Sequence, residues 1–153
     1  SPTRGFIGPG MSPSFVSEID FITIASKGNT TIFGDMDSTR GLGAAANTVR
    51  GLFCGGKGPD QQNLNLIYLI TLASTGNVTE FGNLTSGRRK PEGVSNSTRA
   101  CFAGGNIEPS GRVNIIDFVT IATTADAQDF GDLSVSREAG NSNSDSHGGL
   151  GGY

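Results

Sequence analysis

The residues with the most obvious chemical meaning are an acid, an aromatic residue and a glycine near the C-terminal end. Asp129, Phe130 and Gly131 form the triplet whose carboxylate binds catalytic magnesium in protein kinases. Neither an HRD segment nor a glycine-rich phosphate loop accompanies the triplet, and 153 residues are too few for a kinase. We therefore interpret the triplet as a structural motif.

The aromatic residue of this triplet recurs at intervals of 48 and 49 residues, each time followed by glycine and then by aspartate or asparagine. The residue before it is Asp129, Glu80 or Ile32, so the acid is not part of the motif. We expect a buried aromatic ring, a glycine that bends or admits close backbone, and an Asx side chain that caps a neighbouring amide. The residues of these predicted structural turns are Phe33, Gly34, Asp35, Phe81, Gly82, Asn83, Phe130, Gly131 and Asp132.

Arginine is the most informative charged residue. Arg40, Arg88 and Arg137 each follow the repeated phenylalanine by seven residues. Guanidinium groups repeated around an axis could bind carboxylates or sulfated sugars through paired hydrogen bonds, which makes these three residues weak candidates for a ligand site. The favoured interpretation, because the chain also repeats acids, is that each arginine pairs with an aspartate or a carbonyl of the neighbouring repeat and holds the repeats together.

Paired acids are a second candidate for chemistry. Asp20 and Asp117 align with each other, and Tyr68 stands at that position in the middle repeat. Two carboxylates can form a catalytic dyad, but no histidine or third acid accompanies them in the sequence. Hydrogen bonds between repeats are therefore the favoured interpretation, and the sequence predicts no enzymatic activity.

The cysteines and the histidine predict no metal site and no cofactor. Cys54 and Cys101 form no CxxC pair, and His147, the single histidine, is distant from both. The two cysteines lie on equivalent strands of different repeats, a separation that disfavours a disulfide. Four N-x-S/T sequons, which arise readily in a repeat rich in Thr and Asn, begin at Asn29, Asn77, Asn83 and Asn96.

Composition points to a single β-rich domain. The chain has 24 glycines, no tryptophan and 35% hydrophobic residues, which is typical of a turn-rich β protein. Its net charge of −3 predicts no attraction to nucleic acid. No run of apolar residues is long enough to predict a membrane span.

The repeat predicts an all-β fold of three tandem four-stranded units of about 49 residues that resemble β-propeller blades. In "IIDFVTIA" both faces are largely apolar, so we expect this strand to be covered on both sides, as in stacked blades. A β-trefoil or β-prism remains the alternative. The single domain covers residues 1–153, with repeats at approximately 3–48, 49–97 and 98–145 and the start of a fourth at 146–153.

The two ends of the chain predict self-association. "SHGGLGGY" aligns with "TRGFIGPG" from Thr3, so the chain begins and ends with the same type of strand. Three blades are too few to close a propeller, which usually has about four to eight. We therefore expect a homo-oligomeric ring or a filament assembled through repeat strands.

Four segments of the chain point to a known kind of repeat: "TRACFAGG", "IIDFVTIATT", "DFGDLSVSR" and "SNSDSHGGL". Together they resemble the kelch-like repeats of virion structural and tail-fibre proteins from marine and cyanobacterial phages. The resemblance implies a propeller-like appendage or decoration module at a virion or extracellular surface, which binds a host surface or a partner protein. A lectin with one weak sugar site per repeat, recognising a surface glycan, is the alternative.

Overall fold

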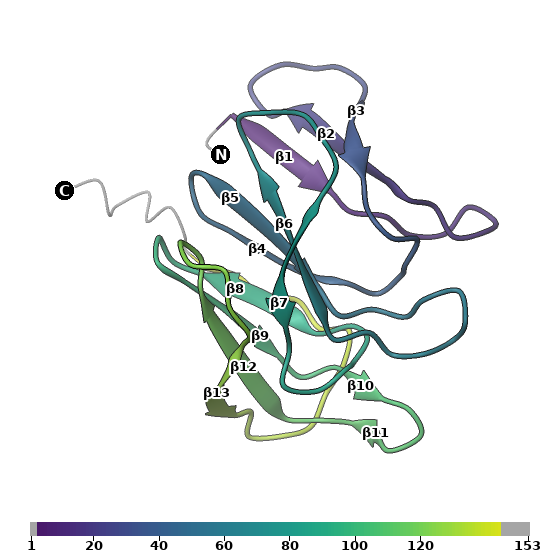
Figure 1. Cartoon of the computed structure of the whole chain (residues 1–153), viewed down its shortest axis with the longest axis vertical. Coiled ribbons are helices and arrows are strands. Elements are labelled where there is room, and N and C mark those ends of the chain that lie inside the picture. Colours follow the sequence, from purple (N-terminus) through teal and green to yellow (C-terminus); the bar gives the residue numbers. More distant parts are fainter. Residues whose placement is uncertain (1–2, 145–153) are drawn as a thin grey trace.

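The computed structural model describes residues 3–144, and their regular structure consists of thirteen β-strands without a helix. The predicted all-β class is confirmed. Figure 1 shows three sheets that follow one another from the N-terminal to the C-terminal part of the chain. Within residues 3–144 the sheets do not close into a propeller. The strand expected at 146–153, with His147, lies outside the described residues.

All three sheets are antiparallel. Sheet 1 contains β1 (Arg4–Ile7), β2 (Glu18–Thr23) and β3 (Thr31–Asp35). Sheet 2 contains β4 (Gly43–Ala46), β5 (Arg50–Cys54), β6 (Leu66–Thr71) and β7 (Thr79–Asn83). Sheet 3 contains β8 (Glu92–Ser95), β9 (Arg99–Ala103), β12 (Ile115–Thr120) and β13 (Gln128–Asp132). A separate short hairpin joins β10 (Asn106–Ile107) to β11 (Gly111–Arg112).

The sheets are offset by one strand from the repeats read in the sequence. The strand expected last in the second repeat becomes β8, and β8 pairs with β9 of the following repeat. The Asn96 side chain closes this hairpin by accepting hydrogen bonds from the amides of Thr98 and Arg99, at 2.9 and 2.7 Å. Asn47 closes the β4–β5 hairpin in the same way. Each asparagine thus fixes where a new sheet begins.

The apolar core consists of two layers, one on each side of sheet 2. One cluster joins sheets 1 and 2 through Ile19, Phe33, Met36, Phe53, Tyr68, Ile70 and Leu72. The other joins sheets 2 and 3 through Ala45, Leu52, Cys54, Ile67, Phe81, Leu84, Ala100, Phe102, Val119 and Ile121. Strand β6 is therefore buried on both faces, as stacked sheets require.

Strand β12 differs from the sequence expectation. Val119 is buried against sheet 2, but Phe118, on the opposite face, is only half-buried. The strand was expected to be covered on both sides because both of its faces are largely apolar. Only one face is covered, because no further sheet follows sheet 3 within the described residues.

The first strands of sheets 2 and 3 approach each other closely. A side chain at Gly93 would collide with the carbonyl of Ala44, so the glycine allows the two backbones to touch. The Ser95 hydroxyl donates to the Ala46 carbonyl at 2.8 Å and accepts from the Ala46 amide at 3.3 Å. Residues 141–144 then lie along β8: the Ser142 hydroxyl donates to the Gly93 carbonyl at 2.8 Å, and the Ser144 hydroxyl accepts from the Ser95 amide.

Candidate functional site

The residues predicted as turns lie inside strands. Each phenylalanine is the extra residue of a β-bulge: Gly34 pairs with Ile19 and Ile32 with Asp20, which leaves Phe33 without a partner on β2. The same register shift occurs at Phe81 and Phe130. The chain does not turn back at these residues, because the bulge only adds one residue to each of β3, β7 and β13 and the strand continues.

The glycines and Asx residues of the first two motifs contact a loop of the next sheet. Side chains at Gly34 and Gly82 would collide with the carbonyls of Gly76 and Ala125, which belong to the next sheet's loop, whereas Gly131 faces open space. The Asx side chains were expected to accept from neighbouring amides, but here the Asx residues provide the amides. Asp35 and Asn83 offer their backbone amides to the side chains of Asn77 and Asp126, at 3.0 and 2.9 Å. The backbone amide of Asp132, at the end of β13, meets no such side-chain acceptor among residues 3–144.

Burial of the repeated phenylalanine depends on whether a sheet follows. Phe33 and Phe81 are 3% and 1% exposed because sheets 2 and 3 cover them. Phe130 is 54% exposed and contacts Phe118 edge to face, with ring centroids 5.9 Å apart. The expected packing of Phe130 in a core is thus absent, because sheet 3 exposes its outer face.

Arg88 lies fully buried between sheets 2 and 3. Its guanidinium donates to the Asp117 carboxylate at 2.8 Å and to the carbonyls of Gly104 and Phe102 at 2.8 and 3.0 Å. Asp117 is also buried and accepts from the Thr85 hydroxyl at 2.7 Å. We call Arg88, Asp117 and Thr85 the inter-sheet lock. Arg88 exposes no atom to a ligand, and its contacts match the favoured interpretation, in which arginine holds the repeats together.

Arg40 occupies a different structural position from Arg88. Arg40 exchanges backbone hydrogen bonds with Lys57, and Arg89 does so with Asn106, 49 residues further on. Arg40 therefore corresponds to Arg89, and the buried Thr39 corresponds to Arg88. The alignment on phenylalanine missed this shift because the connection from β3 to β4 is one residue shorter than the connection from β7 to β8.

Arg137 does correspond to Arg88, but its surroundings differ. It lies exposed beyond β13, where its Nε donates to the Val135 carbonyl at 3.3 Å. Arg40 stacks on the Phe15 ring at 5.5 Å and donates to Gln61 at 3.4 Å. The three predicted arginines thus form no common site within the described residues.

Arg4, Arg50 and Arg99 form a second set of repeated arginines, each at the start of an equivalent strand, β1, β5 or β9. Arg4 of sheet 1 donates to the carbonyl of Leu72, directly after β6 of sheet 2, at 3.1 Å. Arg50 of sheet 2 donates to the carbonyl of Ile121, directly after β12 of sheet 3, at 2.9 Å. Arg99, in sheet 3, instead lies over the Phe118 ring at 5.1 Å. The carbonyl contact recurs wherever a sheet follows.

The two acids that could have formed a dyad, Asp20 and Asp117, lie on opposite sides of sheet 2. Asp117 belongs to the inter-sheet lock. At the corresponding place between sheets 1 and 2, the Tyr68 hydroxyl donates to the Asp37 carboxylate at 2.7 Å. Burial and this hydrogen bond raise the pKa of Tyr68. Asp20 lies on the outer side of sheet 1, half-buried, with sheet 2 between it and Asp117.

Sequence reasoning missed a cluster of basic residues around one carboxylate. Glu108 accepts from Lys57 Nζ at 2.6 Å and pairs with Arg89 at 2.9 Å. The hydrogen bond from Lys57 and the charges of Arg89 and Arg40 hold the pKa of Glu108 below its usual range. Beside this pair, Arg40, Arg89 and Lys90 line a cavity of about 160 Å³. The sequence shows no obvious pattern for this cluster, because its cations lie up to 50 positions apart.

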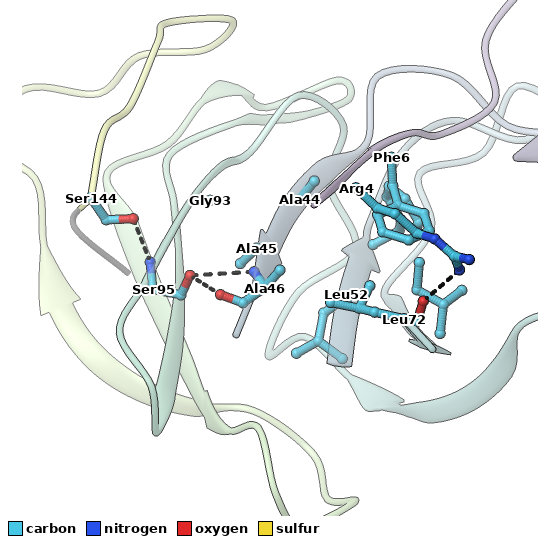
Figure 2. Close-up of a pocket in the computed structure, with 13 residues that line it drawn as sticks. Arg4, Phe6, Ala44, Ala45, Ala46, Leu52, Leu72, Gly93, Ser95 and Ser144 are labelled. Carbon is cyan, nitrogen blue, oxygen red and sulfur yellow. Dashed lines mark hydrogen bonds between the residues drawn. The ribbon is translucent and has the colours of Figure 1, made fainter. Parts of the chain in front are cut away.

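A larger hollow, of about 290 Å³, lies beside the edge of sheet 1. Figure 2 shows Arg4 and Phe6 of β1 on one side of it, Ala44, Ala45 and Ala46 of β4 along its centre, and Ser95 and Ser144 on the other side. β1 is an edge strand that pairs only with β2 among the described strands. The hollow therefore runs beside an open strand edge.

Cys54 and Cys101 are free thiols, the first buried and the second half-buried. Burial raises the pKa of both thiols, so neither is an activated nucleophile. Within residues 3–144 no three His, Cys, Asp or Glu side chains gather as a metal site would require. The same residues contain no helix that is long and apolar enough to cross a membrane.

Comparison with models of protein families finds no match, and comparison with curated proteins finds none either.

Proposed function

We propose that this chain is a non-enzymatic structural and recognition module of a virion or another extracellular appendage. Its sheets are interpreted as propeller-like blades that assemble through their faces and edges, and the assembled surface binds a host surface or a partner protein. The observation that carries the proposal is the recurrence of equivalent contacts between successive sheets. Apolar side chains stay exposed on the outer faces of sheet 1 and sheet 3, which we call the end faces. The kelch-like resemblance of the sequence supports the same assignment.

The exposed end faces support assembly better than catalysis. Phe130 on one end face and Ile24 on the other are more than half exposed, although the matching residues between the sheets are buried. A chain that leaves two apolar sheet faces exposed is expected to cover them with other sheets. The acids instead take part in structural hydrogen bonds, as Asp117 and Asp37 do.

Light scattering coupled to size-exclusion chromatography tests this proposal. The mass of the chain is expected to rise with protein concentration, and electron micrographs are expected to show rings or fibres. A single species at monomer mass over the whole concentration range would contradict it.

The basic cluster favours a second candidate function, binding of an anionic glycan. Arg40, Arg89 and Lys90 surround the small cavity, and the Nε atom of Arg89 is buried without a hydrogen-bond partner among the described residues. A sulfate or carboxylate group on a sugar could accept from these donors. The cavity lies between two repeats, so it would provide a single site instead of one site per repeat.

A glycan array distinguishes this candidate. The chain is expected to bind sulfated or carboxylated glycans, and Arg40→Ala is expected to weaken that binding. Lys27→Ala is the control, because Lys27 is an exposed cation that does not line the cavity and forms no ion pair within residues 3–144. Equal loss in both variants would indicate non-specific charge attraction and contradict a site.

A further inference from the structure

We propose that the outer face of sheet 3 binds sheet 1 of a second copy of this chain, so that copies associate head to tail. The inference rests on the proposed function, in which copies assemble through their sheets. It specifies that the partner is a second copy and which residues of the two copies come into contact. Figure 1 shows sheets 1 and 3 on opposite sides of sheet 2, so these two faces of one molecule do not meet. A second copy can bring them together.

The apolar residues of the two end faces match an interface that already exists inside the chain. Sheet 3 covers sheet 2 with Phe102, Val119 and Ile121, which are buried. Sheet 1 presents the equivalent residues Ile7, Ile22 and Ile24 on its outer face, 48%, 36% and 61% exposed. The same positions are thus buried where a sheet precedes them and exposed where none does.

The receiving face is hollowed at the position where the second copy would bind. A cavity of about 370 Å³ lies on the outer face of sheet 3, lined by Val94, Cys101 and Phe130 and by residues 143–144. In sheet 2 the equivalents of these three residues are Ala45, Leu52 and Phe81, and there strand β9 packs on them with Ala100 and Phe102. Strand β1 is the equivalent of β9. The groove is therefore expected to receive β1 of the second copy.

The polar groups of the inter-sheet lock also have exposed equivalents. Arg137 corresponds to Arg88 and Asp20 to Asp117, and neither Arg137 nor Asp20 forms an ion pair within residues 3–144. We expect Arg137 of one copy to pair with Asp20 of the next, while Ser134 replaces Thr85. Both ends of the lock are thus present in the chain, one on each end face.

Two further contacts follow the same register. Arg50 donates to the Ile121 carbonyl, so its equivalent Arg99 is expected to donate to the Ile24 carbonyl of the second copy. Asp126 accepts from the Asn83 amide, so its equivalent Asn29 is expected to accept from Asp132. These contacts involve residues on both end faces, which fixes one orientation of the second copy.

Residues 141–144 are expected to complete sheet 1 of the second copy. They lie along β8 as β8 lies along β4, they are exposed, and they pair with no strand among the described residues. The register of β8 with β9 places this segment antiparallel to β1, along the open edge beside the hollow of Figure 2. Backbone hydrogen bonds across this edge would add a strand to a three-stranded sheet.

Charge reversal tests the proposal by sedimentation velocity of the full chain. Asp20→Arg and Arg137→Asp are each expected to weaken self-association by about 100-fold or more, because each places two like charges in the buried lock. An equimolar mixture of the two variants is expected to associate again, since Arg137 of the first can pair with Asp20 of the second. Asp60→Arg and Arg112→Asp carry the same charge changes at exposed positions outside the register and serve as controls.

The outcomes separate this inference from the proposed function. Wild-type association that the two lock variants abolish and their mixture restores supports the inference. Wild-type association that neither variant changes contradicts this register but leaves assembly standing. A wild type that stays monomeric contradicts both. If circular dichroism shows that either variant is unfolded, Arg137→Gln and Asp20→Asn replace the pair, and retention of wild-type association in both would overturn the inference.

Discussion

At the scale of the residue, Arg88 is an arginine that holds two sheets together, although its repeated position was also compatible with a ligand site. Its guanidinium has no exposed surface, and its donors meet the Asp117 carboxylate and three carbonyl groups. Removing a guanidinium from water is costly unless its donors find acceptors. Asp117 depends on Arg88 in the same way, so the pair is stable only as a unit.

Replacement of Arg88 tests this dependence. Arg88→Ala is expected to lower the free energy of unfolding by about 3–5 kcal/mol, because it leaves the Asp117 carboxylate buried without its cation. Arg112→Ala, at a side chain that is 65% exposed, is expected to change it by less than about 0.5 kcal/mol. Urea denaturation of both variants provides the measurement. Equal stability of the two variants would show that the lock contributes nothing.

Glu108 provides a pH test at the same scale. Because the folded-state pKa of Glu108 lies below its ordinary value of 4.5, the ionised carboxylate stabilises the folded chain above that value, and this stabilisation is lost as the pH falls through the folded pKa. Glu108→Gln is therefore expected to be less stable than the wild type at neutral pH. The difference should shrink in acid. Thermal unfolding across that range checks this, and a difference independent of pH would contradict it.

At the scale of the element, β7 and β13 show how the same strand has different burial in different surroundings. Both contain a bulge at phenylalanine and pair with the preceding strand in the same register. Phe81 of β7 is covered by sheet 3, whereas Phe130 of β13 is not covered. Hydrophobic stabilisation follows the area removed from water, so it differs between them.

Two matched substitutions measure that difference. Phe81→Ala is expected to lower the free energy of unfolding by about 3–5 kcal/mol because it leaves a cavity in the core. Phe130→Ala is expected to cost only about 1 kcal/mol or less under dilute conditions, where half of its ring stays in water. Urea denaturation at low protein concentration compares them. Similar losses would mean that Phe130 is already covered in solution.

At the scale of the whole molecule, stacking of sheets makes each sheet depend on its neighbours. Sheet 2 has both faces covered, while the outer faces of sheets 1 and 3 expose residues whose equivalents are buried elsewhere. In proteins whose repeats contact only their neighbours, much of the stability comes from the interfaces between neighbouring units. Association through the end faces would supply the interface that each terminal sheet lacks.

Alkylation of Cys101 reports on that association without a change in the sequence. Cys101 lies in the groove on the outer face of sheet 3, whereas Cys54 is buried between sheets 2 and 3. Maleimide is expected to label Cys101 before Cys54, and labelling of Cys101 should slow as the protein concentration rises. The slowing should disappear in Asp20→Arg. Labelling that is independent of concentration would argue against a covered end face.

The all-β class and many of the strands could be predicted from the sequence, because β-branched runs and glycine-ended strands recur at a fixed period. The sequence also indicated that Asp117 and the arginines join repeats. The sheet boundaries were decided by the tertiary structure, since strand partners depend on backbone hydrogen bonds that leave little trace in a local pattern. The structural match of Arg40 with Arg89 was likewise hidden, because a shift of one residue becomes visible only in the pairing with Lys57 and Asn106.

Burial, too, was decided by the tertiary structure. The repeated phenylalanine has the same local sequence three times, yet Phe33 and Phe81 lie in cores and Phe130 lies at the surface. The local sequence pattern specifies on which face of a strand a residue lies, but only the neighbouring sheet removes that face from water. For the same reason Arg88 is part of a buried lock, while Arg137, with the same local sequence position, remains exposed at the end of the stack.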